Sequence, residues 1–149
     1  MNTERFTESL VAALGEAEKR ATLGDHPEVT ELHFLSGAWA TGPLLRGLLA
    51  QTSVSPQAFE NFLAAELERL PRVGGSQAKV GLSRTLYKLL LTAEDEAKRM
   101  KDETCSVEHV LLALFEVENK ALEYFRRNQV GKEHLLAALK KAREEGGEG

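Results

Sequence analysis

Apolar residues recur every three to four positions along most of this chain, a spacing that places them on one face of an α-helix. Leu10, Ala13, Leu14 and Ala17 follow this spacing behind Thr7, whose hydroxyl suits a helix N-cap, so we predict a helix from about residue 8 to 22. Seven further starts follow the same logic: after Thr30, at Gly42-Pro43, after Ser55, after Ser83, after Ser106, and before Leu122 and Leu135. The pattern therefore predicts an all-α fold of eight helices.

The chain also contains an internal repeat, which is found by shifting the sequence by 76 positions without a gap. The shift aligns identical residues and residues of the same role: Leu10 with Leu86, Leu14 with Leu90, Ala17 with Ala93, His33 with His109, Leu35 with Leu111, and the capping residues Thr7 with Ser83 and Thr30 with Ser106. We infer two four-helix repeats, related by a pseudo-twofold axis and packed as one domain.

Proline and glycine set the boundaries of these repeats. Pro71, followed by Gly74 and Gly75, cannot continue a helix, so the prediction is a first repeat over 6–69, a junction over 70–81 and a second repeat over 82–143. The last six residues, 144–149, are glutamate and glycine, and we expect a flexible tail or linker there.

Composition narrows the possible functions. The 149 residues are 42% hydrophobic and 28% charged, and no apolar run approaches the ~18 residues of a membrane span. The net charge is −4 and the basic residues are scattered, which argues against binding nucleic acid. The start lacks a signal-peptide pattern and Cys105 is the single cysteine, so we expect a cytoplasmic protein without a disulfide.

Motifs for catalysis or cofactor binding are absent. The sequence has no phosphate-binding glycine loop, no dinucleotide-binding turn, no His-Glu-x-x-His and no paired Cys-x-x-Cys, so we expect no metal and no cofactor. Cys105 occupies the repeat position of Val29 and is interpreted as a small buried residue; an enzyme would require turnover tied to its thiol. His33 and His109 each begin the second helix of their repeat, which favours packing or capping over metal binding.

Two carboxylates break the repeat. Asp102 aligns with His26 and Glu108 aligns with Leu32, so only the second repeat carries acid at these positions. Two interpretations stay open: Glu108 stabilises the positive end of a helix macrodipole and Asp102 belongs to an ordinary loop, or both belong to a binding site.

Three segments resemble a known family. They are Asn2-Thr3-Glu4-Arg5-Phe6-Thr7, the junction Leu67-Glu68-Arg69-Leu70-Pro71-Arg72-Val73, and Cys105-Ser106-Val107-Glu108-His109-Val110-Leu111-Leu112-Ala113-Leu114. With the repeat spacing, they make the chain similar to the double-repeat amino-terminal domain of the Clp/Hsp100 ATPases, most closely that of the ClpB disaggregases. One departure is Gly37, inside the predicted second helix, where glycine costs about 1 kcal/mol.

The resemblance implies a non-catalytic domain that recruits unfolded or aggregated polypeptides to a hexameric ATPase ring. ATP and magnesium would then bind only in the ATPase domains of the parent protein. It also implies roles in client binding for Thr7, Asp102 and Glu108. Our own hypothesis adds a shallow apolar groove at the seam between the repeats, near Leu10 and Leu86, with the two acids at its lip.

Two alternatives remain open at this point. The first alternative is the adaptor-binding amino-terminal domain of a protease-linked or secretion-linked Clp ATPase, of the ClpA, ClpC or ClpV type, whose partner is one folded protein. The second is a stand-alone accessory protein of a Clp protease. Further candidate partners are an adaptor protein and a partner chaperone system that act on the parent protein.

Overall fold

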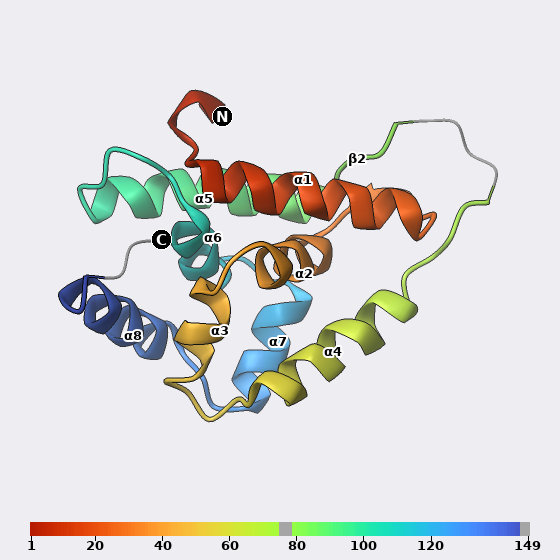
Figure 1. Cartoon of the computed structure of the whole chain (residues 1–149). Coiled ribbons are helices and arrows are strands. Elements are labelled where there is room, and N and C mark those ends of the chain that lie inside the picture. The colour runs from red at the N-terminus through yellow and green to blue at the C-terminus, as the bar shows by residue number, and fades with distance from the viewer. Residues whose placement is uncertain (75–78, 147–149) are drawn as a thin grey trace.

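The structure is a computed structural model that describes residues 1–74 and 79–146 (Figure 1). Within these residues it contains eight α-helices, as the sequence predicts: α1 (Glu8–Leu23), α2 (Glu31–Thr41), α3 (Leu44–Leu49), α4 (Pro56–Glu68), α5 (Arg84–Arg99), α6 (Val107–Ala113), α7 (Lys120–Arg127) and α8 (Lys132–Glu144). A 3-10 turn, η1 (Thr3–Arg5), precedes them, and two short strands, β1 (Glu28–Val29) and β2 (Gly81–Leu82), pair in parallel.

Two of the predicted boundary segments are described only in part. Residues 75–78 of the junction and 147–149 of the tail lie outside the described residues. The predicted tail begins one residue early, because Glu144 is still the last residue of α8.

Hydroxyl caps define the starts of four helices where the sequence predicts them. The hydroxyls of Thr7, Thr30, Ser55 and Ser83 accept hydrogen bonds from backbone amides in the first turns of α1, α2, α4 and α5, at 3.1–3.2 Å. Ser106 also stands at an N-cap position, but its hydroxyl binds elsewhere. Its backbone N–H donates instead to Nδ1 of His109, at 2.9 Å.

The two repeats adopt equivalent conformations. Two equivalent hydrogen bonds join them: the amide of Ser83 donates to the carbonyl of Val29 at 2.9 Å, and the amide of Thr7 donates to the carbonyl of Cys105 at 3.0 Å. The 76-residue shift exchanges these two bonds. The sequence repeat is therefore a structural one, and each repeat lends a short extended segment to the other.

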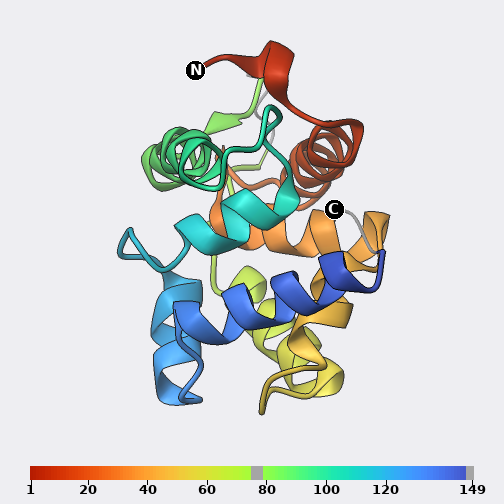
Figure 2. The ribbon, with the colours of Figure 1, turned by 90° about the vertical axis from the view of Figure 1, so that its left-hand side faces the viewer.

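The helices form three layers (Figures 1 and 2). The long helices α1 and α5 lie at the top, α2 and α6 lie beneath them, and α3, α4, α7 and α8 are lowest. α1 packs on α2 and α5 on α6, while α3 of the first repeat contacts α8 of the second. The contact between α3 and α8 therefore helps to join the two repeats into one body.

Gly37 stands where α1 and α2 cross most closely. A Cβ at this position would lie 2.4 Å from the carbonyl oxygen of Ala13, far inside van der Waals contact. The glycine that seemed a departure from helix preference therefore permits the close packing of these two helices.

The core combines aliphatic side chains from both repeats with a cluster of aromatic rings. Phe59 of α4 and Phe125 of α7 stack with ring centroids 6.0 Å apart, and both are fully buried. Among the described residues, no helix has the length and apolar character needed to span a bilayer.

Candidate functional site

An apolar groove opens between α3 and α8, with a volume of about 520 Å³. We call it the apolar groove. Its lining is mostly apolar or small: Ala38, Pro43, Leu44, Gly47, Leu48, Val107, Ala138 and Ala142. Polar groups stand among them, and Lys141 of α8 donates across to Gln51, beyond α3, at 3.4 Å. A cleft of this size and character suits an apolar segment of a polypeptide.

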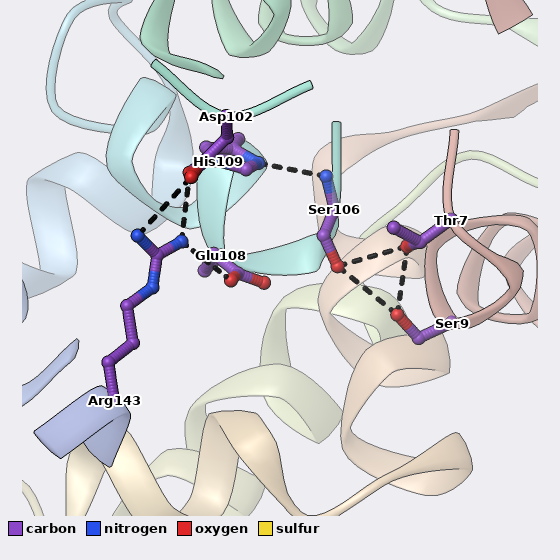
Figure 3. Close-up of polar contacts among 7 residues, drawn as sticks. All are labelled: Thr7, Ser9, Asp102, Ser106, Glu108, His109 and Arg143. Atoms are coloured by element: carbon purple, nitrogen blue, oxygen red, sulfur yellow. Dashed lines mark hydrogen bonds and ion pairs between the residues drawn. The ribbon is translucent and has the colours of Figure 1, made fainter. Parts of the chain in front are cut away.

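A cluster of three hydroxyls lies beside this groove. Thr7 donates to Ser106 at 3.0 Å, and the Ser9 hydroxyl lies within hydrogen-bond distance of both, at 3.0 and 3.2 Å (Figure 3). Ser9 also lines the groove. Thr7 therefore does two things: it caps α1, as its repeat mate Ser83 caps α5, and it joins the start of α1 to the start of α6.

The acidic residues belong to a second cluster, which Arg143 of α8 organises. Arg143 donates to Asp102 at 2.9 Å and to Glu108 at 3.2 Å, and His109 bonds the same Asp102 oxygen at 2.7 Å (Figure 3). Since His109 Nδ1 accepts from the Ser106 amide, its Nε2 carries the proton and donates to Asp102. A continuous polar network thus runs from Thr7 to Glu108.

The network favours the ionised forms of Asp102 and Arg143. Burial works to raise the pKa of Asp102, but the hydrogen bonds from Arg143 and His109 outweigh it and hold that pKa below its usual value. The bond to Asp102 in turn raises the pKa of Arg143. Glu108 is 4% exposed, and its second oxygen, Oε1, has no hydrogen-bond partner among the described residues.

The structure corrects the hypothesis of an acidic lip bordered by Leu10 and Leu86. Both leucines are fully buried in the core, because each lies on the inner face of α1 or α5, so neither offers surface to a ligand. Glu108 is buried as well, under Arg143. Thr7, Asp102 and Glu108 do lie in one network, yet the groove beside it is lined by other residues.

Sequence reasoning missed Arg143 and the lining of α3 and α8. Arg143 lies 41 residues from Asp102, on the last helix, and only the packing of α8 on α6 brings the two together. The one available signal was the pair of acids that break the repeat, Asp102 and Glu108. Carboxylates that become buried near each other need a cationic partner.

In the first repeat, an imidazole replaces the carboxylate. Nδ1 of His26 lies 2.7 Å from Nε2 of His33, which matches the 2.7 Å between Asp102 and His109. Nδ1 of His33 accepts from the Thr30 amide, so His33 donates through Nε2 to His26. Burial, aided by His26, lowers the pKa of His33 to about 4.

The other residues considered for catalysis or metal binding are buried or act as helix caps. Cys105 is 2% exposed, and burial raises the pKa of its thiol to about 12, as expected for a small buried residue. His33 and His109 accept from the N-cap amides of their helices, as the capping interpretation predicts. No group of three or more potential metal ligands occurs in the described part of the chain.

Comparison with known proteins places this geometry in a family. The family model described as the Clp repeat N-terminal domain matches residues 5–129. The chaperone protein ClpB of Nitratidesulfovibrio vulgaris is 32% identical over 96% of this chain, and that of Rhodopirellula baltica is 31% identical over 94%. The chain spans only 17% and 16% of the length of these two proteins.

Solved structures share the fold. The Hsp104 N-terminal domain from Candida albicans has a TM-score of 0.79 at 20% identity, covering 93% of this chain and 91% of that one. The ClpV N-domain in its complex with a VipB peptide has a TM-score of 0.71 at 19% identity, covering 89% and 82%. With its duplicated four-helix repeat and the matched residues 5–129, the chain belongs to the Clp repeat N-terminal domain family.

Proposed function

We propose that this chain is the polypeptide-recruiting domain of a ClpB-type disaggregase and that the apolar groove receives an apolar segment of an unfolded or aggregated client. The groove itself carries the proposal: a mostly apolar cleft of about 520 Å³, formed by helices from both repeats. The similarity to ClpB chaperones over almost the whole chain supports the class of client. The domain binds and does not catalyse; ATP hydrolysis would belong to the parent protein's ring.

In this proposal, the polar network positions one wall of the groove. Lys141 and Ala142 line the groove, while Arg143, next to them on α8, holds Asp102 and Glu108. Asp102 and Glu108 thus act through Arg143 and fix α8 against α6. Thr7 acts in the same way on the part of the lining that α1 and α6 supply, through Ser106 and Ser9.

A client's contacts with one such groove are weak. Ordering a flexible chain costs free energy that a short apolar contact only partly offsets. Several domains on one ring would raise the local concentration of sites and so strengthen the overall binding. Adaptor binding, as in the ClpA, ClpC or ClpV types, is the second candidate, and the VipB peptide complex of a ClpV N-domain favours it.

The first test asks whether a client still binds when a tryptophan side chain occupies the apolar groove. A two-dimensional NMR titration with a permanently unfolded, casein-like polypeptide should shift the amides of Gly47, Leu48 and Ala142. Ala142→Trp should abolish these shifts, because the indole occupies the groove, whereas Ala137→Trp, on an exposed face of α8 outside the lining, should leave them unchanged. Binding that survives Ala142→Trp contradicts the groove, and absence of binding at millimolar client favours the adaptor candidate.

A second test separates positioning from direct contact. Asp102→Ala combined with Glu108→Ala weakens client binding under either reading. Arg143→Ala weakens it only if the acids act through the position of α8; if they touch basic client residues directly, freeing them from Arg143 should strengthen binding. We expect weakening, measured on variants whose circular dichroism matches the wild type.

A further inference from the structure

The pseudo-twofold axis produces a second groove, which we call the charged groove. It lies between α4 and α7, at the position equivalent to the apolar groove between α8 and α3, and has a volume of about 510 Å³. The 76-residue shift carries six lining residues of one groove onto six of the other: Leu44 onto Lys120, Gly47 onto Glu123, Gln51 onto Arg127, Ala138 onto Phe62, Ala142 onto Glu66, and Glu145 onto Arg69.

The duplicated grooves differ in their floors. Where the apolar groove is lined by the small Ala138 and by Leu48, the equivalent residues are Phe62, which lines the charged groove, and Tyr124, whose ring stacks on that of Phe62 with centroids 4.0 Å apart. The six other lining residues of the charged groove all carry a charged side chain. The charged groove therefore does not suit the ligand of its counterpart.

The rims differ in charge. Arg69, Lys120, Arg126 and Arg127 line the charged groove with two carboxylates, Glu66 and Glu123, which leaves an excess of two positive charges on a chain whose net charge is −4. Two cations are in ion pairs whose guanidinium groups are exposed: Arg69 with Glu66 at 3.1 Å and Arg126 with Glu118 at 3.1 Å. Exposed pairs of this kind are worth little and exchange readily for a ligand carboxylate.

Lys120 and Arg127 form no ion pair with the described residues, so both remain available to a ligand. The nearby acid Glu31, at the repeat position of Val107 of the apolar groove, does not oppose this. It is 6% exposed, and its Oε2 accepts the backbone N–H of Lys120 at 3.0 Å, so it holds the start of α7 and does not face the groove.

We propose that the charged groove binds an acidic polypeptide segment, separately from the client in the apolar groove. Lys120 and Arg127 are the principal contacts, and the Arg69 and Arg126 pairs open to share their cations with the ligand. Glu66 and Glu123 select against a continuous phosphate backbone, because a nucleic acid cannot space its charges around them, whereas a polypeptide can place neutral residues there. This inference does not rest on the proposed client binding.

The test uses a short fluorescein-labelled peptide of alternating Glu and Ala, with a Gln-Ala peptide as its neutral match, on the whole chain. Fluorescence anisotropy should show salt-sensitive binding of the acidic peptide alone. The double variant Lys120→Glu, Arg127→Glu should weaken it about tenfold. The matched control Arg84→Glu, Lys88→Glu changes the net charge equally on the exposed face of α5 and should retain wild-type affinity.

Four outcomes would overturn the proposal. They are no binding of the acidic peptide, equal binding of the Gln-Ala peptide, equal losses in both double variants, and tighter binding of single-stranded poly-uridylate with the same dependence on Lys120 and Arg127. The last would make the groove a nucleic-acid site. Amide shifts confined to α4 and α7 mark this groove, and shifts at Gly47 and Leu48 mark the apolar one, so failure here is distinguishable from failure of the client proposal.

Discussion

In the polar network, one residue, Arg143, holds the two carboxylates Asp102 and Glu108. Arg143 is the sole cation bonded to Asp102 and Glu108 among the described residues, and Glu108 has almost no exposed surface. A buried carboxylate without a cation is costly, since it loses hydration without replacement. The network is therefore an obligatory part of the fold as well as a candidate for function.

Arg143→Ala should lower the free energy of unfolding by about 2–3 kcal/mol at pH 7, because it leaves Glu108 buried and unpaired. The folded-state pKa of Asp102 is depressed in the wild type, so its stabilisation is present above pH ~4 and lost as the pH falls below it. Urea denaturation at pH 7 and at pH 3.5 measures both. A variant that keeps the wild-type loss of stability on acidification would contradict the role of Arg143 in holding Asp102 ionised.

The histidine pair of the first repeat predicts a different pH dependence. His33 has a folded-state pKa of about 4 against 6.5 in the unfolded chain. The unfolded state therefore binds more protons between these values, and the stabilisation, about 3 kcal/mol, is present above pH 6.5 and lost as the pH falls towards 4. His26→Asp places a carboxylate beside His33, as in the second repeat, and should raise the His33 pKa and flatten this dependence. An NMR titration of the His33 imidazole that shows no change would contradict it.

At the scale of the elements, the close crossing of α1 and α2 should reverse the sign of the stability change that glycine-to-alanine replacement usually causes in a helix. Replacing glycine by alanine inside a helix normally stabilises by about 1 kcal/mol. Gly37→Ala should instead destabilise by about 2 kcal/mol, since its Cβ would meet the Ala13 carbonyl at 2.4 Å. Gly15→Ala, in α1 with open space around it, is the matched control and should stabilise. Thermal unfolding of both variants decides the matter, and two shifts of the same sign would show that the crossing is looser than 2.4 Å implies.

At this scale, the sequence predicts well those features that depend on residues close together in the chain. Helix starts at Thr7, Thr30 and Ser83 follow from hydroxyl capping within three residues, and the repeat follows from alignment of the chain with itself. The partners across the seam depend on which helices pack together. Ser106 illustrates this, because its hydroxyl leaves the cap to bond Thr7, 99 residues away. The groove lining on α3 and α8 was missed for the same reason.

At the scale of the whole molecule, duplication gives one fold two surfaces of different character. The pseudo-twofold axis preserves the core, where Leu10 and Leu86 are equally buried, and frees the lowest layer to diverge. Substitutions such as Leu44 against Lys120 alter a groove without altering the helices that form it. A domain of this size can thus carry two grooves of different chemistry on one duplicated core.

This arrangement predicts that the two ligands bind independently. The apolar groove uses α3 and α8, the charged groove uses α4 and α7, and the two sets of lining residues share no member. Because a coupling free energy acts equally in both directions, saturating the domain with the acidic peptide should change its affinity for the casein-like polypeptide by less than about twofold, and the reverse should hold. Anisotropy titrations of each labelled ligand in the presence of the other measure this. Mutual displacement would show that both ligands use one groove, and a large reciprocal enhancement would show that the stacked pair of Phe62 and Tyr124 and the central helices transmit binding between the repeats.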